Sequence, residues 1–161
     1  MASSPFPAGQ AAASGSRGGD AAVTTWQLDL PNEAATLRLA EVLCEELKAG
    51  DLVTLSGDLG AGKTTFARGL IRSLAKDASL EVPSPTFTLM QLYDTARPPV
   101  VHADFYRLGS AEELTDLGWE EACEGALVLV EWPQKAEEAL SPDRLDIPFH
   151  LLPQEHPAHR R

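Results

Sequence analysis

The sequence has few basic residues for its length. Its 161 residues contain 13 Lys and Arg against 24 Asp and Glu, which gives a formal net charge of −11. Basic side chains that neutralise phosphates supply most of the affinity of a protein for nucleic acid, so this chain is poorly suited to hold nucleic acid unaided. We expect any connection to RNA to need a partner protein.

Cysteine is scarce, and no long apolar run is present. The two cysteines, Cys44 and Cys123, lie far apart in the sequence, which favours buried thiols over a redox or metal site. No apolar run approaches the roughly 18 residues of a membrane span. The N-terminus also has neither the charged nor the apolar region of a secretory signal. We therefore expect a cytoplasmic protein without a membrane segment.

The composition predicts one folded domain between two unstructured segments. With 43% hydrophobic residues, a chain of this length suffices for one domain with a core. Residues 1–24 are mostly Ala, Ser, Gly and Pro, which cannot bury enough surface to offset the entropy of ordering, and are expected to form a disordered leader. The folded domain is expected at residues 25–152, followed by a flexible polar tail at 153–161.

Residues 57–64 read Gly-Asp-Leu-Gly-Ala-Gly-Lys-Thr and fit G-x-x-x-x-G-K-[ST], the phosphate-binding P-loop. Such a loop lies between a strand and a helix, because it aims backbone N–H groups and a helix N-terminus at a phosphate. Residues 51–56 have the composition of a buried strand, and residues 63–75 carry apolar side chains at helical spacing. We expect Lys63 to reach the β and γ phosphates of a nucleotide and the Thr64 hydroxyl to bind Mg²⁺.

The remaining pattern alternates strands and helices, as expected for an α/β protein. Residues 126–130 are the most apolar run and are typical of a buried parallel strand. The other predicted strands are 26–30, 86–93, 100–106 and 144–152, and the other predicted helices are 32 to about 50, 110–118 and 119–124, with one or two helical turns in 134–140. The strands at 86–93 and 100–106 are expected to form a hairpin, and Ser110 with Glu113 is expected to form a capping box.

Two acids follow predicted strands and are the candidates for chemistry beyond binding. A P-loop alone only binds, whereas hydrolysis or transfer needs Mg²⁺ held from a second side and a positioned nucleophile. Asp104 and Glu131 are both expected near the crevice at the carboxyl ends of the strands, and the sequence leaves open which of them binds the metal directly. Ser84 and Thr86, in a proline-stiffened loop, are candidates for a switch that senses the γ-phosphate.

Two further side chains near these acids have alternative interpretations. Arg107 is either a catalytic arginine that neutralises charge in the transition state or the partner of a nearby acid, the commoner role. Trp132 follows Glu131 and either packs near the nucleotide or belongs to the core.

Four segments together resemble the TsaE family, also called YjeE, small bacterial ATPases required for threonylcarbamoyladenosine (t6A) modification of tRNA. The P-loop segment is generic, but the other three are highly specific in this order and spacing. The resemblance extends from residue 26 to about 147. The four segments are residues 57–65, 84–88, 102–108 and 131–133.

The resemblance implies both a fold and a function. The fold would be an α/β, P-loop NTPase-like three-layer sandwich with a mixed, mainly parallel central sheet. The function would be Mg²⁺-dependent binding and hydrolysis of ATP, with ATP or ADP and Mg²⁺ as the bound groups. The partners would be the TsaD and TsaB subunits of the tRNA-modifying complex, so that this chain would contact tRNA only indirectly.

The resemblance also implies roles for individual residues. Lys63, Asp104 and Glu131 would be catalytic, with Lys63 on the phosphates and Asp104 supporting the metal or the attacking water. Mg²⁺ would be bound by Thr64 and Glu131. The residues expected to contact the nucleotide are Glu33, near the adenine, and Asp58, Leu59, Gly60, Ala61, Gly62, Lys63, Thr64, Thr65, Thr86 and Trp132.

Two other functions remain alternatives at this point. A P-loop small-molecule kinase would need a second-substrate pocket and usually a lid, and no lid segment is evident between the P-loop helix and Asp104. A nucleotide-gated binding module would bind tightly and turn over slowly. The chain also departs from the family pattern in its long leader and in its C-terminal end, where family members usually carry a further strand.

Overall fold

The computed structural model describes residues 11–12, 23–94 and 96–153, and the chain divides into two compact units, residues 1–32 and 33–161. In the first unit, β1 (Ala11–Ala12) pairs antiparallel with β2 (Thr25–Trp26). The strand predicted at 26–30 is thus regular only at its start. Nearly all of the predicted leader and tail lies outside the described residues, so both remain predictions.

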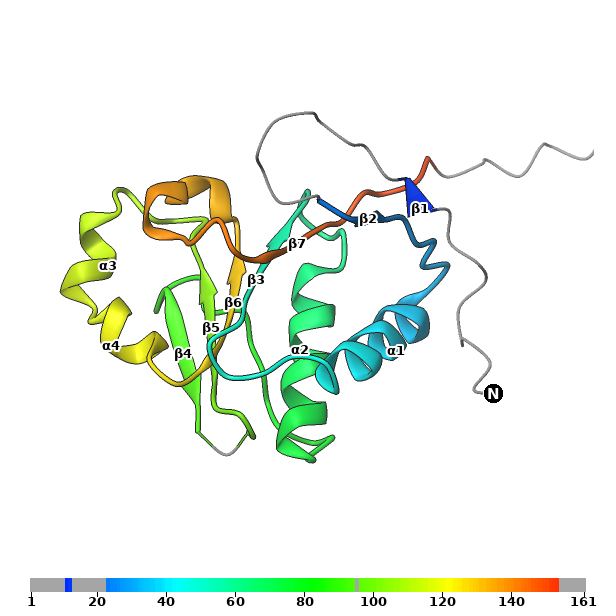
Figure 1. Ribbon diagram of the computed structural model, residues 1–161, viewed down its shortest axis with the longest axis horizontal. Coiled ribbons are helices and arrows are strands. Elements are labelled where there is room, and N and C mark those ends of the chain that lie inside the picture. The colour runs from blue at the N-terminus through cyan, green and yellow to red at the C-terminus, as the bar shows by residue number, and fades with distance from the viewer. Residues whose placement is uncertain (1–10, 13–22, 95, 154–161) are drawn as a thin grey trace, which may run out of the picture. The chain divides into compact units, whose positions relative to one another are not determined.

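The second unit is built on a five-stranded sheet with the order β4-β5-β6-β3-β7 (Figure 1). Neighbouring strands are parallel throughout, except that β4 and β5 form the predicted antiparallel hairpin. The sheet is therefore mixed and mainly parallel, as expected. The strands are β3 (Leu52–Ser56), β4 (Met90–Tyr93), β5 (Val100–Asp104), β6 (Leu127–Glu131) and β7 (Leu145–Pro148).

Helices cover both faces of this sheet and complete three layers (Figure 1). α1 (Glu33–Cys44) and α2 (Lys63–Ala75) pack against each other on one face. Their close approach depends on Gly69, where an added Cβ would lie 2.9 Å from the side chain of Leu37. α3 (Glu112–Asp116) and α4 (Trp119–Cys123) lie on the opposite face, and the 3-10 turns η1 (Pro133–Lys135) and η2 (Glu137–Ala139) follow β6.

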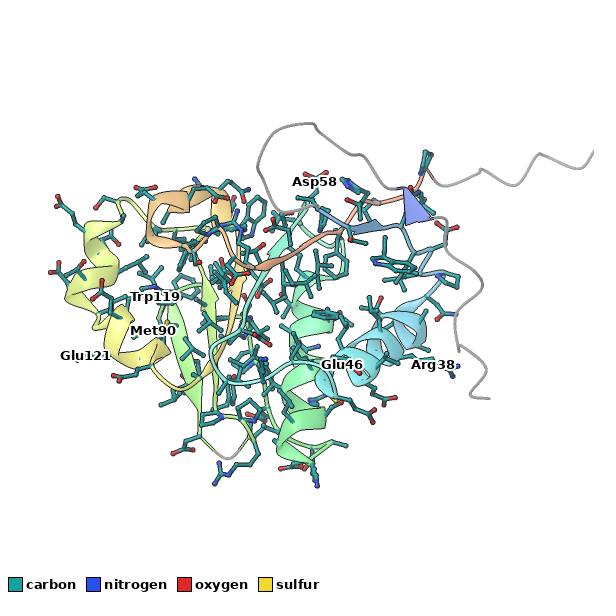
Figure 2. All side chains as sticks on the ribbon, viewed as in Figure 1. Arg38, Glu46, Asp58, Met90, Trp119 and Glu121 are labelled. Carbon is teal, nitrogen blue, oxygen red and sulfur yellow. The ribbon has the colours of Figure 1, made fainter. Side chains whose placement is uncertain are left out.

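Apolar side chains fill the space between the sheet and its helices. Every residue of β5 and β6 is buried, which explains their nearly continuous apolar sequences. On the α3–α4 face, Trp119 packs edge-on against Phe105 with ring centroids 5.4 Å apart. Figure 2 shows Trp119 between α4 and the sheet, whereas Arg38 and Glu121 extend from the surface. None of the described helices is both long and apolar enough to cross a bilayer.

Several predicted boundaries differ from the structure for local reasons. The strand predicted to start at residue 86 starts at Met90, because Leu89 is left-handed (φ 66°) and its N–H donates to the carbonyl of Pro85, which makes residues 85–89 a turn. The predicted capping box is also wrong. Ala111 is the N-cap of α3, and the Glu113 carboxylate instead accepts the N–H of Gly109 at 3.0 Å.

The predictions for the last strand and for the two cysteines also differ from the structure. β7 ends at Pro148, and it lies parallel beside β3 at the edge of the sheet. The thiols of Cys44 and Cys123 are both free and only partly buried. Burial raises the pKa of the Cys123 thiol to about 11.

Candidate functional site

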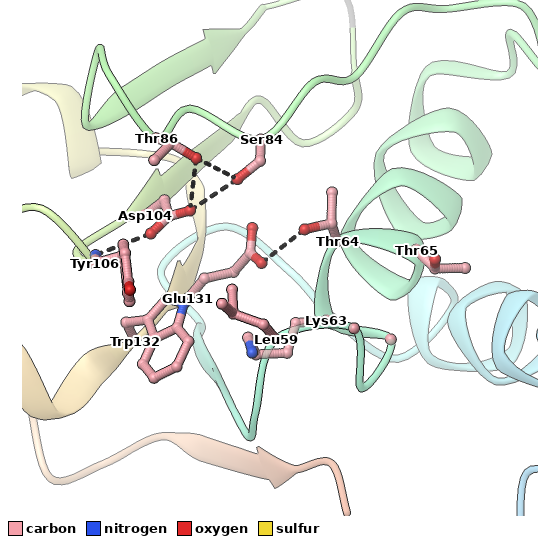
Figure 3. Close-up of a pocket in the computed structure, with 12 residues that line it drawn as sticks. Leu59, Lys63, Thr64, Thr65, Ser84, Thr86, Asp104, Tyr106, Glu131 and Trp132 are labelled. Carbon is pink, nitrogen blue, oxygen red and sulfur yellow. Dashed lines mark hydrogen bonds between the residues drawn. The ribbon is translucent and has the colours of Figure 1, made fainter. Parts of the chain in front are cut away.

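A cavity of about 350 Å³ opens where the P-loop meets the carboxyl ends of β5 and β6 (Figure 3). Its volume lies at the lower end of the range for small-molecule sites, roughly 300–1,000 Å³. The lining residues come from the P-loop and the start of α2, from the loop after α2, and from the ends of β5 and β6. They are Leu59, Gly60, Gly62, Lys63, Thr64, Thr65, Ser84, Thr86, Asp104, Tyr106, Glu131 and Trp132.

The P-loop adopts its shape through glycines with positive φ. Gly57 has a φ of 128°, and a Cβ there would lie 2.2 Å from the carbonyl oxygen of Phe149. Gly62 has a φ of 114° and is the N-cap of α2, where its carbonyl accepts the N–H of Phe66 at 2.9 Å. The first turn of α2 thereby lines the cavity, and the partial positive charge of a helix N-terminus favours an anion there.

Lys63 places a cation in the cavity wall. Its side chain is nearly buried, and its Nζ donates to the carbonyl of Gly57 and, at 3.0 Å, to that of Asp58. The same Nζ lies 4.4 Å from the centroid of the Trp132 ring. An ammonium group has three N–H donors, so one donor remains for a ligand in the cavity.

The charge of Lys63 is subject to opposing influences. Burial lowers the pKa of this ammonium below its ordinary value, while the carboxylates of Glu131, Asp104 and Asp58 raise it. The net direction is downward. A phosphate in the cavity would add negative charge beside Lys63 and so stabilise its protonated form.

Glu131 ends β6 and faces the start of α2. Its Oε1 accepts a hydrogen bond from the Thr64 hydroxyl at 2.9 Å, and its Oε2 lies 2.7 Å from His102 Nε2. Only 1% of Glu131 and none of His102 is exposed. Since β5 and β6 are parallel neighbours with Asp104 opposite Glu131, the two acids lie side by side at one end of the sheet.

Asp104 connects the loop after α2 to the end of β5 through hydrogen bonds. Its Oδ2 accepts hydrogen bonds from the hydroxyls of Ser84, at 2.7 Å, and Thr86, at 3.3 Å, as Figure 3 shows. Its Oδ1 accepts the backbone N–H of Tyr106 at 2.9 Å. The carboxylate therefore holds two hydroxyl groups at the wall opposite Lys63.

An aromatic pair forms another wall of the cavity. The rings of Tyr106 and Trp132 are tilted, with centroids 5.0 Å apart. Trp132 has a φ of 56°, a left-handed conformation that is uncommon for a bulky residue, and its N–H donates to the carbonyl of Leu55 at 3.2 Å. Such backbone conformations persist where the surroundings enforce them, often at functional sites.

The structure brings most of the predicted site residues together. Eleven of them line the cavity: Leu59, Gly60, Gly62, Lys63, Thr64, Thr65, Ser84, Thr86, Asp104, Glu131 and Trp132. Glu33, Asp58 and Ala61 do not line it, although the carbonyl of Asp58 accepts a hydrogen bond from Lys63. The roles of all these residues remain predictions.

Two residues of the site were given no role from the sequence, and one further candidate lies outside the cavity. Tyr106 lines the cavity, and His102 lies behind Glu131. The alternation of a strand could have indicated His102, because residues 102 and 104 of β5 share a face of the sheet. Arg107, considered as a catalytic arginine or as the partner of an acid, does not line the cavity and lies over the exposed ring of Phe87, with its guanidinium carbon 4.5 Å from the centroid.

The arrangement suits an anion and a hard cation together. Lys63 and the N-terminus of α2 favour a phosphate, whereas the oxygens of Thr64 and Glu131 are ligands that Mg²⁺ accepts. Within the part of the chain that the structure describes, no group of three or more His, Cys, Asp or Glu side chains is placed to hold a metal. Mg²⁺ is usually bound by one or two carboxylates with phosphates and water, and the donor set of this cavity fits that pattern.

A mainly parallel sheet, a glycine-rich loop leading into a helix and acids at the ends of adjacent strands define a P-loop α/β protein. Residues 30–160 match the sequence profile of the family described as threonylcarbamoyl adenosine biosynthesis protein TsaE. The chain therefore belongs to the TsaE family, whose members take part in the biosynthesis of threonylcarbamoyladenosine in tRNA.

Individual relatives agree with this assignment. A TsaE protein of Rickettsia felis is 42% identical over 125 residues, which cover 78% of this chain and 72% of the relative. A TsaE protein of Mycobacterium tuberculosis is 42% identical over 127 residues, with 73% of this chain and 74% of the relative covered. The crystal structure of Bacillus subtilis YdiB superposes with a TM-score of 0.60 at 36% identity, over 73% of this chain and 70% of YdiB.

Proposed function

We propose that this protein binds ATP together with Mg²⁺ and hydrolyses it, as the ATPase of t6A biosynthesis. The proposal rests on one observation above all. A lysine, a threonine hydroxyl and two strand-end carboxylates converge on one cavity beside the N-terminus of α2. These are the groups that phosphoryl transfer requires, because its catalysis consists mainly of positioning and electrostatic stabilisation.

Binding of the nucleotide would use the P-loop side of the cavity. The third donor of Lys63 and the backbone N–H groups at the start of α2 would hold the β and γ phosphates. Thr64 and Glu131, already joined by a hydrogen bond, would hold the metal ion. The aromatic ring of Trp132 lies against Lys63 and would therefore sit close to the phosphates.

Hydrolysis would use residues on both the Lys63 side and the Asp104 side of the cavity. A water oxygen attacks the γ-phosphorus, the bond to the β–γ bridging oxygen breaks, and ADP, inorganic phosphate and the proton lost by the water leave. Bound Mg²⁺ would offset the charge that develops on the phosphate oxygens. Lys63 adds positive charge from the loop side, and Asp104 with the hydroxyls of Ser84 and Thr86 offers acceptors that can orient the attacking water.

We further propose that TsaD and TsaB are the partners and that the protein acts in the cytoplasm. The membership of the TsaE family supports a place in tRNA modification. The net charge of −11 disfavours direct binding of tRNA by this chain. The partner subunits would accordingly hold the tRNA while this chain turns over ATP.

Phosphate release from ATP tests the proposal. The wild-type protein is incubated with ATP and Mg²⁺, alone and with TsaD and TsaB, beside Lys63→Met as the variant without the ammonium. We expect the release to fall at least about a hundredfold in the variant, the effect of removing one charge-stabilising donor. Equal release by the two proteins would contradict the site. Transfer to a metabolite without free phosphate would indicate a kinase, and binding without any release would indicate a binding module.

A further inference from the structure

His102 is a fully buried polar side chain in the middle of the sheet. It lies on β5, which has neighbours on both sides, and its Nε2 lies 2.7 Å from Glu131 Oε2. Its other ring nitrogen, Nδ1, is also buried and has no hydrogen-bond partner among the described residues. A polar side chain in this position needs a reason, because apolar residues surround it along β5 and β6.

The unpartnered nitrogen identifies where the ring proton lies. A carboxylate only accepts hydrogen bonds, so the 2.7 Å contact between Nε2 and Glu131 Oε2 needs a hydrogen on Nε2, and a second hydrogen on the buried Nδ1 would have no acceptor. Nδ1 is therefore the unprotonated nitrogen, and Nε2 carries the hydrogen that points at Glu131. His102 is then a donor, and Glu131 is the acceptor of both of its hydrogen bonds.

We propose that His102 is a positioning residue that fixes the Glu131 carboxylate for the metal ion, an inference that rests on the proposed function. The two oxygens of Glu131 are engaged from opposite elements, Oε2 by His102 on β5 and Oε1 by Thr64 on α2. With Oε2 held from behind, the carboxylate keeps Oε1 at the cavity beside the threonine hydroxyl. His102 itself does not line the cavity, so it acts through Glu131.

Removing the Nε2–H donor of His102 would affect Glu131 directly. An apolar side chain at position 102 would leave Oε2 buried with no donor from β5, and the carboxylate would be free to turn away from Thr64. Groups that orient a metal-binding side chain typically change metal affinity by about 10–100-fold when they are removed. The effect should appear in the metal requirement, because the contacts of Lys63 and the P-loop with the phosphates stay intact.

Two substitutions of similar size distinguish the loss of the His102 hydrogen-bond donor from the loss of its side-chain volume. His102→Gln can place an amide N–H near the position of Nε2, whereas His102→Met fills the same space without a donor. Nucleotide binding is measured for both variants and the wild type in EDTA and in a series of Mg²⁺ concentrations. We expect the half-saturating Mg²⁺ concentration to rise at least about tenfold in His102→Met and to stay within about threefold in His102→Gln. Affinity in EDTA should be unchanged in both.

The same data distinguish this inference from the proposed function. If the wild type binds no nucleotide at any Mg²⁺ concentration, the proposed function fails. If it binds and His102→Met has the wild-type Mg²⁺ requirement, the positioning role fails instead. A loss of affinity in EDTA that matches the loss in Mg²⁺ would show a general structural role and would likewise overturn the inference.

A spectroscopic measurement on the wild-type protein keeps the inference testable even if His102→Met does not fold. The ring nitrogens of His102, labelled with ¹⁵N, have different chemical shifts in the two tautomers. We expect the signal of the Nε2–H form in the full chain without nucleotide. A signal of the Nδ1–H form would overturn the inference, because His102 would then have no proton to donate to Glu131.

Discussion

At the scale of single residues, Trp132 combines an unfavourable backbone with contacts in the cavity. Its left-handed φ of 56° is a conformation in which the Cβ is crowded by the following carbonyl oxygen. Its ring contacts both Lys63 and Tyr106. The left-handed backbone is therefore strained, and it places this ring in the cavity wall.

The pair Trp132→Gly and Trp132→Ala measures this strain. Both variants lose the ring, so the difference between them reports the backbone alone. We expect the free energy of unfolding of Trp132→Gly to exceed that of Trp132→Ala by about 1 kcal/mol, because glycine adopts the left-handed region without a Cβ. Urea unfolding of the two variants measures the difference. A Trp132→Ala protein that is as stable as Trp132→Gly would show that position 132 is not strained.

At the scale of elements, the last strand supports the P-loop from the edge of the sheet. β7 pairs with β3, the strand that leads into the loop, and the N–H of Phe149 donates to the carbonyl of Ser56 at 2.8 Å. The Phe149 ring packs against Phe66 of α2, with centroids 5.9 Å apart. Arg144, before β7, forms ion pairs with Glu137 at 2.8 Å and with Asp146 at 2.9 Å. The segment from 144 to 149 therefore links β3, α2 and η2.

Alanine at Gly57 or Gly60 tests how closely β7 is packed on the loop. Both glycines have positive φ, so both substitutions strain the backbone. Only at Gly57 would the new Cβ meet another group, the Phe149 carbonyl oxygen at 2.2 Å, whereas nothing lies within 4 Å at Gly60. We expect Gly57→Ala to lower the free energy of unfolding by about 2 kcal/mol more than Gly60→Ala, the range for overpacking. Equal losses in urea unfolding would refute close packing of Phe149 on the loop.

At the scale of the whole molecule, the sheet order brings distant segments to one cavity. β6 lies between β5 and β3, so the parallel register places Asp104, Glu131 and the P-loop at the same end of the sheet. Thr64 and Glu131, which are 67 positions apart in the sequence, thereby come within hydrogen-bond distance. The residues of the site come together only because the strands have this order in the sheet.

The sequence predicted the parts of this arrangement that depend on local patterns. The span of α2 followed from helical periodicity, the buried β6 from its apolar run, and the hairpin from two neighbouring strand-like segments. The strand-end acids followed from the general geometry of parallel sheets. The turn at Leu89 was not predictable, because a left-handed leucine has no local signal. The pairing of β7 with β3 and the contact of His102 with Glu131 depend on the sheet order, which local patterns do not determine.

The most direct test of the account is a titration of the wild-type protein with ATP and Mg²⁺, followed by tryptophan fluorescence. Trp132 lines the cavity against Lys63, so bound phosphates would change its surroundings directly. Trp132→Phe serves as the control for the source of the signal, since the chain has two other tryptophans, Trp26 and Trp119. We expect a saturable change in the wild type that is absent in Trp132→Phe. A flat wild-type titration up to millimolar ATP would contradict it.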